Sequence, residues 1–191
     1  MKKTYVNILI FIAISFSPSC FSQQYLSLKQ ALLIPKDSVT HLKLSKQKLT
    51  EVPSIIWRFR NLIALDLSKN RLNSIPDSMA VLSHLEELIL RKNKLTIFPT
   101  SLYNLKGLKY LNLSSNQIGY VPNGIMNCSE LTELDLYNNP ISDLGDGLQE
   151  LQKLKRLDLR GLMMNAKKQA QISVKIPGVQ ILFDAPCNCV N

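Results

Sequence analysis

Glycine, histidine and cysteine are scarce in this sequence, and their scarcity excludes several kinds of site. None of the seven glycines belongs to a glycine-rich phosphate loop, and the two histidines and four cysteines form no metal-ligand cluster. Beyond the amino-terminal segment only Cys128, Cys187 and Cys189 remain, which is no basis for a disulfide framework. A bridge between Cys187 and Cys189 would be strained, because a single residue separates them, so their redox state stays open. We expect no metal and no cofactor.

The apolar run at the amino terminus is too short to cross a membrane. It covers residues 6–16, whereas a spanning helix needs about 20 residues. Lys2 and Lys3 precede it and small residues follow it, which is the order of a secretion signal rather than of a buried helix. We predict a signal peptide over residues 1–22 and export to the periplasm, the cell surface or the medium.

A lipid anchor at Cys20 is the alternative for this segment. It is less favoured, because Ser17 stands where the lipobox carries a large aliphatic residue. If the signal were false, the whole chain would be interpreted as an intracellular signalling scaffold.

Basic residues outnumber acidic ones, and the formal net charge of +9 includes Lys2 and Lys3 of the predicted signal. The remaining excess favours anionic surfaces in general. We expect no nucleic-acid partner, because the chain carries an export signal and its basic residues lack interleaved aromatics.

One pattern, L-x-x-L-x-L-x-x-N-x-L-x-x-I-P, recurs at intervals of 23 residues. A period of this length is typical of a solenoid, in which each unit buries its apolar side against its neighbours. Alternation of apolar and polar residues at positions four to six predicts a short strand with one buried face. The copies open at Val39, Leu62, Leu85, Leu108 and Leu131, and a damaged sixth copy opens at Leu154.

Position nine of the repeat holds asparagine in four copies, at Asn70, Asn93, Asn116 and Asn139. A buried amide there would satisfy backbone groups of its own turn and of the neighbouring one. Gln47 takes the place in the first copy, and Leu162 in the sixth. The proline at position fifteen pre-sets its backbone angle and starts the turn to the outer side.

These positions resemble those of bacterial leucine-rich repeat proteins of the 23-residue type, a pattern shared with the Ras-group-related leucine-rich repeat proteins. The resemblance covers about residues 39–161. It implies an α/β fold, a curved leucine-rich repeat solenoid with a parallel sheet on its inner face and irregular or short helical segments outside. It implies little about function, because this family binds many unrelated ligands.

Four segments follow from the pattern. We expect the signal peptide at 1–22, an N-terminal helical cap at 23–38, six repeats at 39–161, and a C-terminal cap and tail at 162–191. The first cap has the capping-box residues Ser27 and Gln30, followed by an apolar face that includes Leu32. The second is expected to hold a helix starting after Asn165, then an edge strand, then a loose tail from Asp184.

The first candidate site is an apolar, aromatic and cationic group on the inner face, which we call the tyrosine–arginine patch. Tyrosine and arginine are the residues that dominate binding hot spots. We predict that a protein partner docks there, with Arg91, Tyr110 and Tyr137 near the centre. In the alternative, the tyrosines only pack on neighbouring side chains, and Arg156 and Arg160 only neutralise Asp135 and Asp158. The patch comprises Ile89, Arg91, Tyr110, Tyr137, Arg156 and Arg160.

The second candidate site is a row of cations at positions eight and ten of the first three repeats, which we call the basic rim. It would bind an anionic glycan, a lipid surface or an acidic protein. The alternative is a solvated edge without a ligand, since exposed like charges repel only weakly in water. The rim comprises Lys46, Lys48, Lys69, Arg71, Lys92 and Lys94.

The remaining polar residues do not suggest an enzyme. Asp135 and Asp158 should be adjacent on the sheet, but on an open face, whereas a general acid needs a secluded site. His41 and His84 fall at different repeat positions, with His41 expected to be solvated on the inner face. Cys128 takes a core leucine position and has no basic neighbour to activate it. We therefore predict a non-enzymatic, exported protein-binding module.

Overall fold

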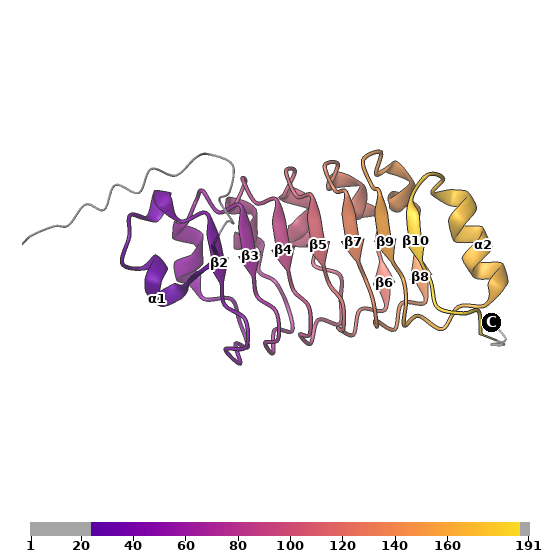
Figure 1. Cartoon of the computed structure of the whole chain (residues 1–191), viewed down its shortest axis with the longest axis horizontal. Coiled ribbons are helices and arrows are strands. Elements are labelled where there is room, and N and C mark those ends of the chain that lie inside the picture. Colours follow the sequence, from indigo (N-terminus) through magenta and orange to yellow (C-terminus); the bar gives the residue numbers. More distant parts are fainter. Residues whose placement is uncertain (1–23, 188–191) are drawn as a thin grey trace, which may run out of the picture.

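The computed structural model describes residues 24–187, so the predicted signal peptide, Cys20 and Cys189 lie outside the described residues. The chain forms a single row of parallel strands, which faces the viewer in Figure 1. Its eight-stranded sheet has the order β1-β2-β3-β4-β5-β7-β9-β10. These strands are β1 (Leu26–Ser27), β2 (His41–Lys43), β3 (Ala64–Asp66), β4 (Glu87–Ile89), β5 (Tyr110–Asn112), β7 (Glu133–Asp135), β9 (Arg156–Asp158) and β10 (Gln180–Leu182).

The register of the sheet follows the sequence period. Leu42 pairs with Leu65, which pairs with Leu88, and each further step as far as Leu157 is again 23 residues. The apolar residues at positions one, four and six, all leucine except Val39, are buried in every repeat and form one continuous core. The period of the sequence therefore sets the register, because a slip of one residue would turn these leucines to water.

The asparagines of position nine form a ladder through this core. The Asn93 side chain accepts from Leu72 N at 3.1 Å and donates to Leu90 O and Leu67 O at 2.9 and 3.1 Å. Leu67 O also accepts from Asn70, and Leu90 O from Asn116, so neighbouring asparagines share each carbonyl. This confirms that the amide serves both its own unit and the previous one.

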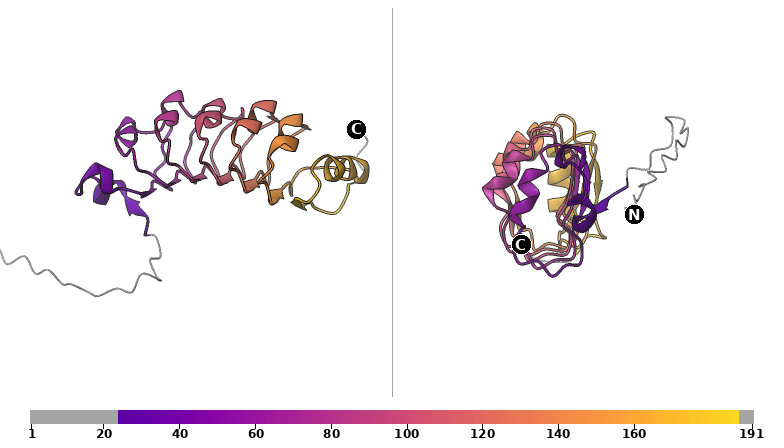
Figure 2. Two further views of the ribbon diagram at one scale, coloured as in Figure 1. Left: turned by 90° about the horizontal axis from the view of Figure 1, so that it is seen from above. Right: turned by 90° about the vertical axis from the view of Figure 1, so that its left-hand side faces the viewer.

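The outer side consists of five-residue 3-10 helices, seen opposite the sheet in Figure 2. Each begins directly after the proline of its repeat, or after Gly145 in the fifth, and carries buried apolar residues toward the core. Two short strands, β6 (Tyr120–Val121) and β8 (Asp143–Leu144), form a second parallel ladder behind the sheet. The helices are η2 (Ser54–Arg58), η3 (Asp77–Val81), η4 (Thr100–Asn104), η5 (Asn123–Asn127) and η6 (Asp146–Glu150).

Gly147 allows the last two of these helices to pack closely. A Cβ at Gly147 would lie 2.0 Å from the backbone oxygen of Asn123 in η5. Glycine at this buried position thus lets η6 approach the backbone of η5 directly.

The amino-terminal cap begins with β1, which extends the sheet by one strand, and continues in α1 (Leu28–Ala31). The capping box of Ser27 and Gln30 is present. The helix is shorter than expected: it ends at Ala31, and Leu32 at its C-cap is 53% exposed instead of lying on a buried apolar face. A short 3-10 helix, η1 (Lys36–Ser38), leads into the first repeat.

The carboxy-terminal cap contains α2 (Ala166–Lys175), whose N-cap Asn165 accepts from Lys168 N, and the edge strand β10. Both elements agree with the helix and the edge strand that were expected from the sequence. Asp184 is more ordered than a loose tail, because its carboxylate accepts from Gly161 N and its carbonyl accepts from Gln169 Nε2. Cys187 is disulfide-bonded. Over residues 24–187, no helix has the length and apolar character needed to cross a membrane.

Candidate protein-binding face

The exposed side of the eight-stranded sheet, here called the inner face, carries the side chains of repeat positions three, five and seven. Strand pairing places Tyr110 beside Glu133, Asn112 beside Asp135, and Asp135 beside Asp158. Members of the tyrosine–arginine patch therefore lie on the four consecutive strands β4, β5, β7 and β9 or directly after them.

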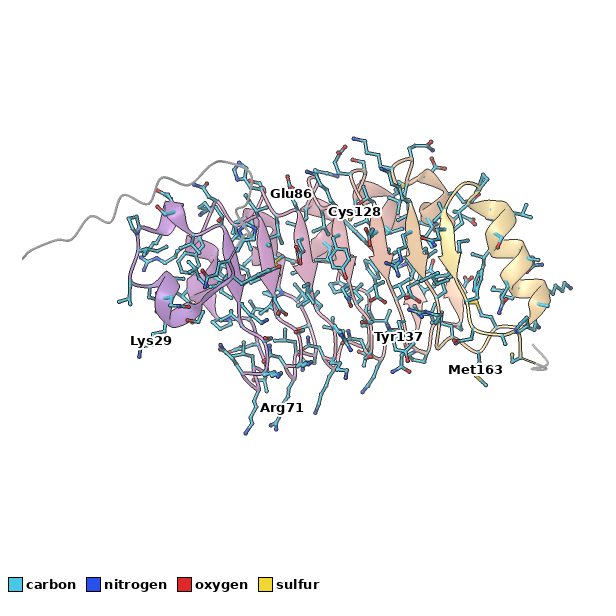
Figure 3. All side chains as sticks on the ribbon, in the orientation of Figure 1. Lys29, Arg71, Glu86, Cys128, Tyr137 and Met163 are labelled. Carbon is cyan, nitrogen blue, oxygen red and sulfur yellow. The ribbon has the colours of Figure 1, made fainter. Side chains whose placement is uncertain are left out.

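Tyr137 is the most exposed aromatic residue of the patch, at 43%. The guanidinium carbon of Arg160 lies 5.8 Å from the centre of its ring, within cation–π range. Arg160 is fixed by Asp158, to which Nε and Nη2 donate at 3.0 and 2.6 Å. Burial raises the pKa of Asp158, but its hydrogen bonds from Arg160 outweigh burial and hold the pKa below the ordinary value. Tyr137, labelled in Figure 3, and Arg160 thus form a preorganised pair.

Tyr110 is half-buried on the neighbouring side of the patch, and its hydroxyl accepts from Asn112 Nδ2 at 3.1 Å. Asn112 also donates to Asp135 at 2.8 Å. Burial raises the pKa of Asp135, and the charge of Asp158 raises it further. A pocket of about 50 Å³ lies between Tyr110, Asp135 and Asp158, which is too small to enclose a substrate.

Arg156 pairs with Glu133 at 3.9 Å, and Arg160 pairs with Asp158 at 2.6 Å. The alternative, in which these two arginines neutralise Asp135 and Asp158, therefore holds for Asp158, whereas Asp135 has no ion pair among the described residues. The physical reason is register: Arg156 and Glu133 are direct partners at position three, whereas Asp135 is at position five. Arg91 is exposed and joins no ion pair among the described residues, although its charge partly opposes the rise in the pKa of Asp135 that burial causes. Ile89 is half-buried on β4, where it pairs with Asn112 of β5.

Tyr25 is an inner-face residue that the sequence argument did not find. It precedes β1, packs edge-on against His41 with ring centroids 5.6 Å apart, and donates to Glu87 at 2.7 Å. The expectation that His41 is solvated is therefore wrong: it is buried, because Tyr25 lies against it. The available signal was an aromatic residue without an assigned role inside the predicted cap, but nothing in its spacing indicated that Leu26 would join the sheet.

All six residues of the basic rim are exposed along one edge, where Arg71 is labelled in Figure 3. None of them joins a salt bridge within residues 24–187. Four have left-handed backbone angles, with φ of 62° at Lys46, 58° at Lys48, 57° at Lys69 and 55° at Lys92. The sequence placed these cations together, but it did not predict their backbone conformation.

The groups that could support catalysis are dispersed. Cys128 lies in the core, its Sγ is 3.4 Å from Leu102 O, and burial raises its pKa to about 11. His84 is exposed on the far edge, next to Arg60 O. In the described part of the chain, no three His, Cys, Asp or Glu side chains gather in a way that could hold a metal.

A cavity of about 700 Å³ lies away from the inner face, between α2 and η6. Leu144, Leu148 and Ile172 line it, with Lys168 and Lys175 at its border. These two lysines reach Asp143 and Asp146 at 3.8 and 2.7 Å, so the border is internally paired.

A stack of short repeats with an open parallel sheet and outer 3-10 helices defines a solenoid, a fold whose open face commonly serves as a binding surface. The leucine rich repeat family matches residues 37–95, 60–118 and 84–141, which together span more than half of the chain. The chain belongs to this family, whose members are generally non-enzymatic binding modules. The family resemblance and the fold that were expected from the sequence are thereby confirmed.

Solved bacterial structures share the fold. A leucine-rich repeat protein of Leptospira interrogans has 26% identity and a TM-score of 0.63, over 78% of this chain and 45% of that chain. Internalin C2 of Listeria monocytogenes has 26% identity and a TM-score of 0.65, over 76% of this chain and 62% of that one. This chain therefore spans between about half and three fifths of these relatives.

Another Listeria monocytogenes internalin, at 22% identity, covers 80% of this chain and 43% of its own length with a TM-score of 0.63, and shows the fold alone. A search of curated proteins finds none that matches.

Proposed function

We propose that this chain is an exported, non-enzymatic module that binds a protein partner through the tyrosine–arginine patch. The observation that carries the proposal is the fixed pair of Tyr137 and Arg160 on an otherwise polar, open sheet. Because Asp158 already holds Arg160, docking onto this pair costs little side-chain entropy. Leucine-rich repeat domains typically bind proteins, which supports this class of partner.

The patch combines features of a hot spot with charge of both signs. Tyr137 and Arg91 are exposed, while Tyr110 and Ile89 are partly covered and offer apolar surface between them. The carboxylates of Asp135 and Glu133 lie beside these residues. A partner with its own aromatic or arginine anchor and a matching acidic or basic group fits such a surface best.

A photocrosslinking experiment tests the site. We expect a crosslinking amino acid at position 137, in the full chain within its native envelope, to capture a discrete partner. The matched control carries the same amino acid at Tyr120, which is 44% exposed but lies in the second sheet behind the inner face. Capture from position 120 and not from 137 contradicts the proposed face.

The affinity of substituted variants for the captured partner then tests which residues form the binding site. R91A/Y110A/Y137A should weaken binding by about 100-fold or more, since a hot-spot residue contributes about 2 kcal/mol. R58A/R60A/Y120A removes similar side chains from the outer side and should leave the affinity within about twofold. Equal loss in both variants, with native circular dichroism, excludes recognition by the patch.

Export is supported by the charge and apolar run of the amino-terminal sequence. Amino-terminal sequencing of the mature protein should begin at Gln23. A blocked terminus at a lipid-modified Cys20 favours the anchored form, and an intact Met1 in the cytoplasm contradicts export.

A further inference from the structure

The basic rim is a second surface, separate from the tyrosine–arginine patch. Its cations follow the strands of the first three repeats, at the edge where the chain leaves the sheet. In the next two repeats the same positions carry no charge, because they hold Ser115, Gln117, Asn138 and Pro140. The row of cations therefore has a defined length of three units and a defined end.

The backbone fixes the spacing of the row. At position eight, Lys46 N, Lys69 N and Lys92 N donate to the carbonyl of position seven in the next unit, at 3.0, 2.8 and 2.9 Å. At position ten, Arg71 N and Lys94 N donate to the previous unit at 2.7 and 2.8 Å. Two parallel rows of cations thus rise from backbone held at the strand spacing of about 4.8 Å.

The lysines of the rim occupy a backbone conformation that does not favour lysine. Position eight is left-handed in every repeat. The fourth repeat holds Ser115 there, and the last two hold Asn138 and Gly161, which tolerate this conformation better. Lys46, Lys69 and Lys92 stand where asparagine or glycine would be less strained, and Lys48 is strained as well. Strain kept at neighbouring positions of one surface is typical of a functional site.

The neighbours of the rim indicate the chemistry of its ligand. Thr50, Asn73 and Thr96, at position twelve of the same repeats, are exposed and present hydroxyl and amide groups. No aromatic side chain stands at positions eight to thirteen of these repeats, and Ile97 is their one strongly exposed apolar residue. A protein hot spot needs aromatic anchors, and a membrane contact needs more apolar area, so both fit this surface less well.

We propose that the basic rim binds a linear acidic polysaccharide, whose regularly spaced carboxylates run along the stack and whose hydroxyls meet position twelve. The rows of cations run across the strands, so the glycan lies along the long axis of the solenoid. Binding at the rim does not require occupation of the patch, because the two surfaces share no residue.

Fluorescence anisotropy with labelled polygalacturonate and the full chain tests the proposal. K69Q/R71Q/K92Q should weaken binding at least about tenfold and flatten its dependence on salt. K36Q/R58Q/R60Q removes the same charge from exposed cations outside the rim and should leave binding within about twofold. No binding by the natural chain at low salt, or equal loss in both variants, overturns the proposal.

A variant that is expected to bind more tightly provides a test that does not rely on the removal of side chains. S115K/Q117K extends the row into the fourth repeat, at a position eight where Lys92 already shows that lysine is tolerated. We expect tighter binding to polygalacturonate than with S83K/S129K, which adds the same charge at exposed sites on the opposite edge. Equal gains from both variants indicate net charge alone and overturn the proposal.

Two further probes separate the other anionic ligands. Polyglutamate represents an acidic protein, and vesicles of phosphatidylcholine and phosphatidylglycerol in equal amounts represent a membrane. Weaker rim-dependent binding to both than to polygalacturonate supports the glycan. Tighter rim-dependent binding to either one overturns it in favour of that ligand class.

Discussion

At the scale of single residues, equivalent positions of the repeat differ in what they do. Position eight is left-handed throughout, yet it holds lysine in the first three repeats and serine, asparagine and glycine afterwards. Position nine holds a buried amide in four repeats, whereas Gln47 is exposed. The backbone conformation at a repeat position is therefore constant, whereas the residues that occupy the position differ in how well they tolerate it.

The substitution Lys69→Asn tests whether a lysine at position eight is held in a strained backbone conformation. We expect the free energy of unfolding to rise by up to about 1 kcal/mol, because asparagine tolerates the left-handed conformation better than lysine. Urea denaturation measures the change. Lys36→Asn, at an exposed site in η1 that is not among the left-handed residues, should bring no gain. A less stable Lys69→Asn variant contradicts the strain argument.

At the scale of elements, the outer helices determine how closely the repeats stack. Successive 3-10 helices pack against one another, and η5 and η6 do so most closely around Gly147. Gly145, in place of proline, adds a donor: its N–H reaches Val121 O at 2.8 Å. A proline there could not donate, so glycine gives the fifth repeat an additional link to the fourth.

Gly147→Ala should destabilise the protein by about 1–3 kcal/mol through overpacking of η6 on η5. The added methyl would meet the Asn123 carbonyl, which belongs to backbone and cannot rotate away. Thermal unfolding followed by circular dichroism measures the loss. Gly119→Ala is the matched control, since a Cβ there meets nothing within 4 Å. Similar melting temperatures for the two variants would falsify the packing argument.

At the scale of the whole molecule, one core and one asparagine ladder make the repeats interdependent. Each shared carbonyl accepts from two asparagines, and the ladder stops where Gln47 and Leu162 stand in place of asparagine. The two candidate surfaces lie on different parts of this rigid stack, with the rim on the first three repeats and the patch mainly on the later ones. A single solenoid with one continuous core thus presents both surfaces.

Asn93→Ala tests the ladder at its centre. It leaves Leu72 N without a partner and removes one of two donors from Leu67 O and Leu90 O, so we expect a loss of about 2 kcal/mol or more. Because repeats depend on their neighbours, the unfolding transition should also broaden. Gln47→Ala, at the exposed equivalent position, should change stability by less than about 0.5 kcal/mol. Equal losses contradict a special role of the buried amide.

Much of the candidate sites could be predicted from the repeat, because the position of a residue in the repeat decides which face of the solenoid it occupies. This logic placed Tyr110, Tyr137 and Arg160 on one sheet. It failed for Tyr25, which lies before the repeats, and therefore also for His41, against which Tyr25 packs. The alternative of neutralising arginines included the pair of Arg160 and Asp158 but not the pair of Arg156 and Glu133, because side-chain pairing depends on strand register and rotamer rather than on sequence distance.

The sequence alone determined the solenoid, its leucine core and the ladder of amides, since each is repeated every 23 residues and each copy reinforces the same geometry. Only the tertiary structure decided the left-handed lysines of the rim, the addition of β1 to the sheet and the fixed pair of Tyr137 and Arg160. The physical reason is that these features arise from contacts between units, where one strand's backbone and side chains constrain those of the next.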